Sequence, residues 1–255
     1  MIASLMMYAR PELAEAQGRY WQMIRQELAR RGIDSPETLA QEAEEFSVWT
    51  APNLVLSQTC GMPFRLWLHD RVRLIGTPDF GLDDCPPGFY RSAFVIRADD
   101  ARTRVEDFAG AVFAYNQTFS QSGFAAPYNH LKPRGFWFSN LWQSHGHLMS
   151  ARAVAEGTAD IAALDAVSWR LMQKYEHFAG NLRVLEWTDP TPGLPYIANK
   201  SADRQATFEA VTAAIAALDD ADRAVLGLRG LVDIPAENYL AVPNPDLDYG
   251  AGPAG

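Results

Sequence analysis

The pattern that most constrains the fold is an alternation of short apolar runs with amphipathic helical stretches along most of the 255 residues. Runs such as Leu54-Val55-Leu56-Ser57 and residues 160–164 have the length of buried strands. Between such runs, apolar residues recur at helical spacing, as in the stretch from Leu13 to Leu28, which Gly32 closes. This alternation predicts an α/β fold with largely parallel sheets.

Two stretches predict that the chain crosses between two lobes. Residues 90–97 form a long alternating run that precedes a charged segment, and residues 188–195 are rich in Pro and Thr. We therefore expect lobe 1 to comprise residues 1–92 plus 195–255 and lobe 2 to comprise residues 93–194, with a ligand cleft between them. The end of the chain, residues 243–255, is rich in Pro, Gly and Asp and predicts a surface tail.

The charge balance limits the classes of partner. The net charge is -9, and the 22 Lys and Arg residues are scattered along the chain. This argues against nucleic acid and against an acidic membrane surface. No stretch approaches 18 uninterrupted apolar residues, so we expect no membrane insertion. A small anion is still compatible, because helix N-termini hold anions with neutral groups.

The first residues and the cysteines bear on the compartment. Residues 1–8 are too short for the apolar core of a signal peptide and lack a basic start, so they predict a first core strand. On this basis the protein is cytoplasmic if the sequence is complete, and otherwise a leader is missing. Cys60 and Cys85 allow one disulfide but equally allow two thiols.

The stretch from Tyr115 to Pro127 predicts an anion cradle. A short apolar run ends at Tyr115, and a helix can begin near residue 122 with Ser120 or Ser122 as its N-cap. Backbone N–H groups and the positive end of the helix dipole then point at one spot, where the hydroxyls add donors. The alternative is that both serines merely cap the helix and contact water.

Five motifs occur in the order and spacing of a known family. They are Leu56–Pro63 (LSQTCGMP), Gly76–Pro78 (GTP), Cys85–Ser92 (CPPGFYRS), Ser120–Gly123 (SQSG) and Ala153–Asp165 (AVAEGTADIAALD). Together they resemble the phosphate/phosphite/phosphonate-type substrate-binding proteins of ABC transporters. The resemblance implies a two-lobe type 2 periplasmic-binding-protein fold, in which each lobe is a mostly parallel sheet flanked by helices and two crossover strands join the lobes. It also implies a periplasmic, non-enzymatic protein that serves an ABC permease.

The resemblance carries ligand roles onto particular residues. The oxyanion would be held by Ser120, Gln121, Ser122 and Gly123, although Gln121 stands where the family has a hydroxyl. Asp165 would face an aminoalkyl group of a phosphonate, or would instead be the N-cap of the next helix. The further candidates lie mostly at predicted strand ends or line the cleft: Tyr8, Ser57, Gln58, Thr59, Tyr90, Arg91, Asn116 and His145.

Other chemistries fit the sequence less well. His145 and His147 are two apart at the start of a helix, where their rings would diverge, and no acidic or Cys partner is nearby, so we expect no metal and no cofactor. A hydrolase triad is conceivable, but there is no Gly-x-Ser-x-Gly elbow. The sequence thus predicts capture of a small anionic solute such as a phosphonate or phosphate ester. The alternative is a cytoplasmic sensor or enzyme of the same fold acting on a small organic molecule, for example a pyrimidine or a sulfonate.

Overall fold

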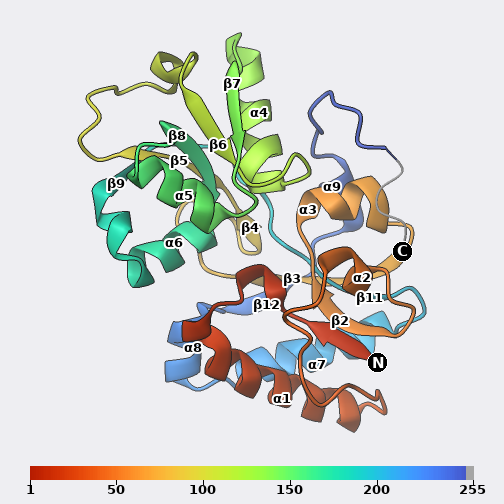
Figure 1. Ribbon diagram of the computed structural model, residues 1–255. Coiled ribbons are helices and arrows are strands. Elements are labelled where there is room, and N and C mark those ends of the chain that lie inside the picture. Colours follow the sequence, from red (N-terminus) through yellow and green to blue (C-terminus); the bar gives the residue numbers. More distant parts are fainter. Residues whose placement is uncertain (251–255) are drawn as a thin grey trace. The chain divides into compact units, whose positions relative to one another are not determined.

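The computed structural model describes residues 1–250 and divides the chain into two compact units. Unit 1 comprises residues 1–89, 192–241 and 249–255, and unit 2 comprises residues 90–191 and 242–248. The chain therefore passes from unit 1 to unit 2 after residue 89 and returns after residue 191 (Figure 1). Each unit contains its own five-stranded sheet, as expected for the two-lobe α/β fold.

The sheet of unit 1 has the strand order β1-β2-β11-β3-β12. β1 pairs with β2 in parallel, whereas β11 is antiparallel to both β2 and β3, and β12 is antiparallel to β3. The strand that the chain forms on its return from unit 2 is therefore inserted, reversed, in the middle of the sheet. The strands are β1 (Ile2–Ser4), β2 (Leu54–Gln58), β3 (Val72–Asp79), β11 (Tyr196–Asn199) and β12 (Gly230–Val232).

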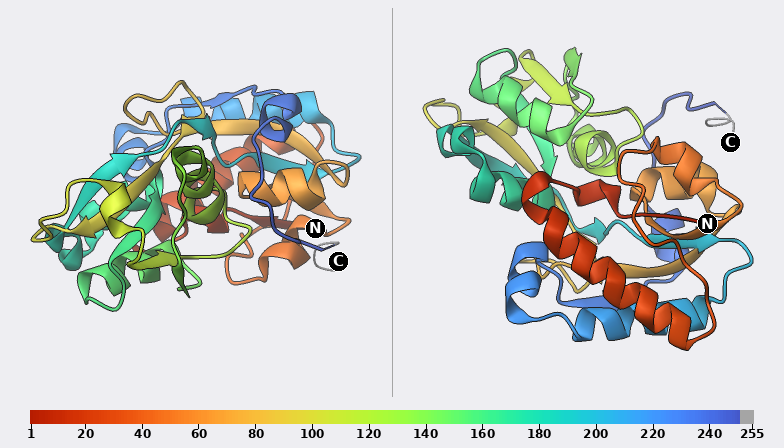
Figure 2. Two further views of the ribbon diagram at one scale, coloured as in Figure 1. Left: turned by 90° about the horizontal axis from the view of Figure 1, so that it is seen from above. Right: turned by 60° about the horizontal axis from the view of Figure 1, so that its bottom comes forward.

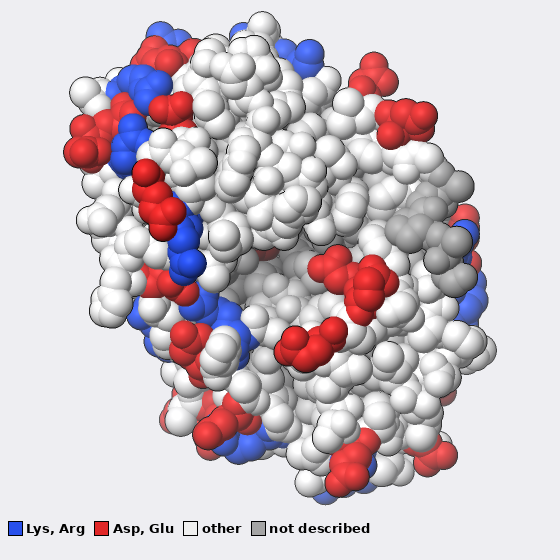
Figure 3. Space-filling model, in the orientation of Figure 1, with Lys and Arg blue, Asp and Glu red and all other residues white. Residues whose placement is uncertain are grey.

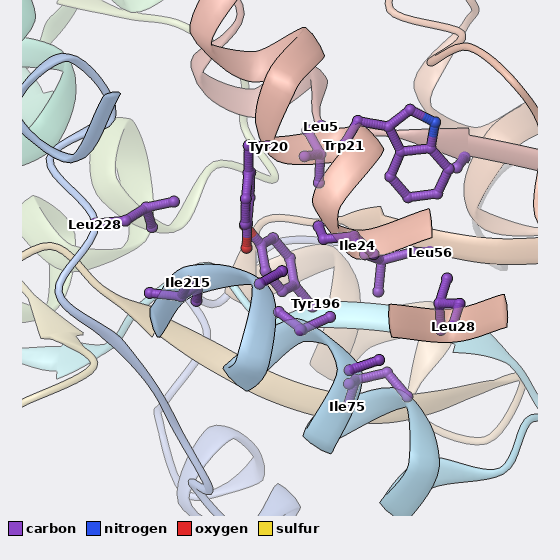
Figure 4. Close-up of a cluster of buried hydrophobic side chains, with 14 of the residues drawn as sticks. Leu5, Tyr20, Trp21, Ile24, Leu28, Leu56, Ile75, Tyr196, Ile215 and Leu228 are labelled. Atoms are coloured by element: carbon purple, nitrogen blue, oxygen red, sulfur yellow. The ribbon is translucent and has the colours of Figure 1, made fainter. Parts of the chain in front are cut away.

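Helices α1 and α7 cover one face of the unit 1 sheet. α1 and α7 lie side by side, and their apolar side chains form one core with the sheet (Figures 1 and 2). In that core the Tyr20 and Tyr196 rings point toward each other between α1 and β11, with their hydroxyls 3.4 Å apart (Figure 4). The helices of unit 1 are η1 (Met6–Tyr8), η2 (Pro11–Leu13), α1 (Ala14–Arg30), α2 (Glu45–Trp49), α3 (Gly61–Pro63), η3 (Phe64–Leu68), α7 (Arg204–Ala216), α8 (Asp220–Leu226) and α9 (Ala236–Leu240).

The sheet of unit 2 has the strand order β7-β6-β8-β5-β9. β6 is parallel to β7 and β8, and β5 is antiparallel to its neighbours β8 and β9. Again the reversed strand is the one that the chain forms on entering the unit, and the other four strands share one direction. The strands are β5 (Ser92–Arg97), β6 (Val112–Tyr115), β7 (Asn140–Gln143), β8 (Ile161–Asp165) and β9 (Leu182–Trp187).

Two apolar clusters sandwich the unit 2 sheet. Ala93 and Val95 of β5 pack with α5 and α6, while Phe94 and Ile96 pack with η4 and α4 on the other face. This alternation is what the strand period of two requires of a sheet covered on both sides. The helices of unit 2 are η4 (Val105–Phe108), η5 (Gln121–Ala125), α4 (Ala126–Leu131), η6 (Lys132–Arg134), α5 (His147–Ala155), α6 (Ala166–Tyr175) and η7 (His177–Asn181).

The two passages between the units run beside each other. β4 (Phe89–Tyr90) and β10 (Thr191–Pro192) pair as a two-stranded sheet. Next to it the amide N of Gly193 donates to the carbonyl O of Gly88 at 2.8 Å, and a Cβ on Gly193 would lie only 2.8 Å from that oxygen. The buried hydroxyl of Tyr239 donates to the carbonyl O of Gly193 at 3.0 Å, so α9 fixes the start of the return passage.

Three sequence expectations differ in detail from these units. The unit boundaries fall three residues earlier than expected on both passages. The first strand ends at Ser4, because residues 6–8 form a 3-10 turn. Residues 243–248 of the expected surface tail group with unit 2, where the Asn129 side chain donates to the Pro243 carbonyl O at 2.7 Å. Residues 251–255 of that tail lie outside the described part of the chain.

Candidate ligand-binding site

The helix that follows β6 begins as expected at Ser120. Its side chain is the N-cap and accepts a hydrogen bond from the backbone N–H of Gly123 at 3.0 Å. The first turns are wide, because the amides of both Phe124 and Ala125 bond to the carbonyl O of Ser120. η5 then continues directly into α4, so one continuous helix runs from residue 121 to residue 131. N–H groups of a first helical turn have no partner within the helix and can hold an anion.

Gly123 is the most crowded position of this helix start. A Cβ there would lie 1.9 Å from Oδ1 of Asn116 and 3.2 Å from Cε1 of His147. The backbone of η5 therefore approaches the loop after β6 more closely than any other residue type would allow. This packing brings residues from three segments together at one edge of the unit 2 sheet.

His147 is the first residue of α5 and contacts the helix start directly. Its Nε2 lies 2.8 Å from Oγ of Ser122. Burial lowers the pKa of His147 to about 4, because the charged imidazolium loses its water, and this outweighs a backbone contact at Ala163 that favours the charged form. The imidazole is therefore neutral near pH 7, and its contact with Ser122 is between neutral groups.

Two buried polar atoms at this edge have no hydrogen-bond partner among the described residues. They are Oδ1 of Asn116 and Oγ of Ser92. Ser92 pairs with Asp165 in the β5–β8 ladder, and Asn116 follows the end of β6, so these atoms belong to the edge where β6 and β8 end. Buried polar groups are seldom left unpaired, because each costs about 1–3 kcal/mol when it loses water. A polar ligand would satisfy them.

Asp165 is a helix N-cap, which the sequence analysis gave as the alternative to a ligand contact. Its carboxylate caps α6 and accepts a hydrogen bond from the backbone N–H of Ser168 at 2.9 Å. The side chain is 2% exposed and stands at the same sheet edge as Ser92. A cap uses one of several acceptor positions of a carboxylate, so a contact of Asp165 with a ligand stays a prediction.

The other candidates of unit 2 differ in their surroundings. Tyr90 is buried, and the guanidinium of Arg91 lies 4.5 Å from the ring centroid of Trp187. His145 is exposed and has φ +65°, a left-handed conformation that is uncommon outside Gly. Its amide bonds to the carbonyl O of Asn116 at 3.1 Å, which ties the loops after β6 and β7 together.

The candidates of unit 1 are buried and already donate within the protein. The Gln58 side-chain amide donates to the carbonyl O of Leu194 at 3.1 Å, and the Thr59 hydroxyl donates to the carbonyl O of Cys60 at 3.4 Å. The Ser57 hydroxyl lies 3.5 Å from the carbonyl O of Gln58. Tyr8 is buried with its ring against Phe80 at 5.1 Å. Ser57, Gln58 and Thr59 thus hold the end of β2 and the return passage in place.

One group at this edge was not among the expected ligand residues. His147, and not the exposed His145, contacts Ser122. The signal lay in Gly146, the N-cap of α5, which places His147 in the first helical turn at the sheet edge. Ser92 belongs to a predicted strand end with Tyr90 and Arg91, but the missing partner of its hydroxyl could not be inferred from sequence.

Several wider observations concern metals, thiols and membranes. Among residues 1–250, no group of three or more His, Cys, Asp or Glu side chains could hold a metal ion. Cys60 and Cys85, both described, are not joined by a disulfide. None of the helices described for this chain combines the length and the apolar character needed to cross a membrane.

Comparison with protein families gives one match over most of the chain. Residues 72–239 match the model of the phosphonate periplasmic substrate-binding proteins of ABC transporters. No curated protein matches the chain in sequence.

Solved structures share the fold at low identity. PhnD1 from Prochlorococcus marinus, solved with methylphosphonate, has a TM-score of 0.68 and 12% identity, and the match covers 93% of each chain. XAC2383 from Xanthomonas citri, bound to ATP, has a TM-score of 0.67 and 14% identity, over 94% of this chain and 96% of that one. A phosphonate-transporter binding protein from Pseudomonas aeruginosa has a TM-score of 0.63 and 15% identity, over 91% and 80%. At these identities the structural matches establish the fold alone.

Proposed function

The chain belongs to the phosphonate periplasmic substrate-binding proteins of ABC transporters, and we propose that it captures a phosphonate or a closely related oxyanion at the Ser120–Gly123 helix start. It is a solute-binding protein and not an enzyme. In this proposal the unit 2 edge supplies the oxyanion contacts, and the protein delivers the ligand to an ABC permease. The likeness to PhnD1, solved with methylphosphonate, supports this ligand class.

The observation that carries the proposal is the contact of Ser122 with a neutral, half-buried His147. If Nε2 of His147 carries the proton, it donates to Oγ of Ser122, and the Ser122 hydroxyl then points its own proton at the ligand. In the other tautomer Ser122 donates to His147 and has none to offer. The backbone contact at Ala163 favours the second tautomer, and an oxyanion that accepts from Ser122 favours the first, in which His147 orients Ser122 toward the ligand.

The site also suits a ligand with more than an oxyanion. Oδ1 of Asn116 is an acceptor, and the carboxyl group of Asp165 offers further acceptor positions at the same edge. Acceptors of this kind are satisfied by hydroxyl or ammonium groups and disfavour a bare dianion. We therefore propose a phosphonate with a small hydrogen-bond-donating substituent as the preferred ligand.

The family suggests where the protein is located and which membrane protein it serves. The family is periplasmic, and we propose the same location for this protein, with an ABC permease as its membrane partner. Fractionation of cells that produce the protein from its own gene tests the location. Recovery in the cytoplasmic fraction alone would favour the sensor alternative over transport.

The ligand assignment is tested by isothermal titration of methylphosphonate and aminoethylphosphonate into the Ser120→Ala/Ser122→Ala variant. Loss of two charge-assisted hydrogen bonds should weaken binding by about 1.5–3 kcal/mol each. Ser120 is also a helix cap, so its replacement can affect folding as well as binding. The single variant Ser122→Ala leaves the cap intact and should itself bind the ligand more weakly than the wild type.

The matched control is Ser139→Ala, which removes an exposed hydroxyl in the same unit. It should leave the affinity unchanged. Wild-type affinity in the Ser120→Ala/Ser122→Ala variant would show that the helix start does not bind the ligand. If no phosphonate raises the melting temperature of the wild-type protein, the ligand class itself is wrong.

A further inference from the structure

Two adjoining hollows lie in unit 1, away from the Ser57–Thr59 edge. The first has a volume of about 550 Å³ and includes Val72, where β3 begins, and Asn199, where β11 ends. The second has a volume of about 320 Å³ and shares Val72 and Lys200 with the first. β2 starts at this end of the sheet and finishes at Gln58, so the hollows occupy the opposite end from the polar groups that follow β2.

Four cations line these hollows, and we call them the basic face: Arg71, Arg73, Lys200 and Arg204. Arg204 pairs with Asp233, and the Arg73 guanidinium donates to the carbonyl O of Lys200 at 3.0 Å. Arg71 and Lys200 are exposed, and no carboxylate of residues 1–250 forms an ion pair with either.

Many cations elsewhere form ion pairs. In unit 2, Arg102 pairs with Asp100 at 2.6 Å and with Asp160 at 3.5 Å, and Arg97 lies 3.9 Å from Asp100. Figure 3 likewise shows Lys and Arg beside Asp and Glu along one edge of the face it presents. Single exposed cations such as Lys132 also have no carboxylate partner among residues 1–250. What distinguishes the basic face is that four cations line two adjoining hollows.

The second hollow adds an apolar surface to these charges. Its lining is mainly apolar and comes from η3, β3 and the start of α9: Phe64, Val72, Leu74, Ile234, Pro235 and Ala236. An occupant of both hollows would therefore present carboxylates to Arg71 and Lys200 and an apolar side chain to the second hollow. Charge and apolar surface this close together restrict the occupant to an amphipathic anion.

We propose that the basic face docks an acidic segment of a partner protein that carries one apolar anchor residue. Both hollows open onto solvent, whereas small-molecule sites enclose most of their ligand. A protein segment can span both hollows and cover them. Four cations grouped on one face of a chain with a net charge of -9 attract an acidic segment to that face and orient the encounter. None of these residues belongs to the ligand site of unit 2, so the two assignments stand or fall separately.

The test is fluorescence anisotropy with a labelled synthetic peptide in which glutamates surround a single phenylalanine. The full-length protein should bind this peptide at low salt, and added salt should weaken the binding. The variant Arg71→Glu/Lys200→Glu should bind about tenfold more weakly, since two exposed attractive contacts become repulsive. Replacing the peptide's phenylalanine with alanine should weaken binding further, because the apolar hollow is left empty.

The control Lys132→Glu/Lys174→Glu makes the same change in net charge at two exposed positions of unit 2 and should bind the peptide like the wild type. Equal weakening in both double variants, or no binding by the wild type, overturns the proposal. So does competition by citrate at the concentration at which citrate itself binds, because the face would then be a small-anion site. A dimer in sedimentation that only Arg71→Glu/Lys200→Glu abolishes would also overturn it, because the occupant would be a second copy.

Discussion

The strand ends of the two units carry similar polar residues but use them differently. In unit 1, the side chains of Gln58 and Thr59 donate to backbone carbonyls of their own unit. In unit 2, buried oxygen atoms of Asn116 and Ser92 have no partner among the described residues. Polar residues at a strand end are therefore no guide to binding by themselves. What favours the unit 2 edge as the proposed ligand site is that part of its hydrogen-bonding capacity is unused.

The largest expected effect comes from Gly123→Ala in unit 2. The added Cβ would overlap Oδ1 of Asn116, and relieving such an overlap costs about 3 kcal/mol, or roughly 100-fold in ligand affinity. Titration with methylphosphonate measures the affinity, and the melting temperature separates binding from folding. Gly110→Ala is the control, because nothing lies within 4 Å of a Cβ there. Equal affinities of the two variants would show that the close approach of Gly123 to Asn116 does not contribute to ligand binding.

The next effect is a pH dependence of the folding stability, which we expect from His147 at the unit 2 edge. The pKa of His147 is lowered to about 4 in the folded protein, so the unfolded chain takes up a proton first as the pH falls. The stability should be complete above about pH 6.5 and should fall by roughly 2–3 kcal/mol between pH 6.5 and pH 4. Urea unfolding of His147→Gln should lack this loss, whereas His145→Gln should keep it. If the stability of His147→Gln fell with pH as in the wild type, His147 would not be the group whose neutral form the folded protein favours.

The smallest effect concerns Gln58 in unit 1 and should appear in stability alone. Gln58→Met keeps the length of the side chain but removes its hydrogen bond to Leu194, at a cost of about 1 kcal/mol. Urea unfolding should detect that loss, while the affinity for methylphosphonate should stay within about twofold of the wild type. If Gln58→Met lost as much affinity as Ser122→Ala, the strand end of unit 1 would contribute to binding as the unit 2 edge does.

Sequence patterns identified the architecture because periodicity and strand ends are local properties. The helix start at Ser120 and the cap at Asp165 were both among the expectations, since capping depends on residue type at one position. The choice between His145 and His147 was not local, because it depends on the residue at which α5 begins. Which hydroxyls and amides find partners depends on packing across the sheet, as with Ser92, and periodicity carries no information about it.

The position of β11 has a consequence for biosynthesis. β11 (residues 196–199) lies between β2 and β3, so the unit 1 sheet lacks its central strand until about four-fifths of the chain has been made. The sheet of unit 2, in contrast, comes from one uninterrupted stretch of residues 90–191. Domains generally fold as units while the chain is being synthesised. Unit 2 can therefore fold on the ribosome before β11, the central strand of the unit 1 sheet, has been made. The order of folding is therefore the reverse of the order in which the two units begin.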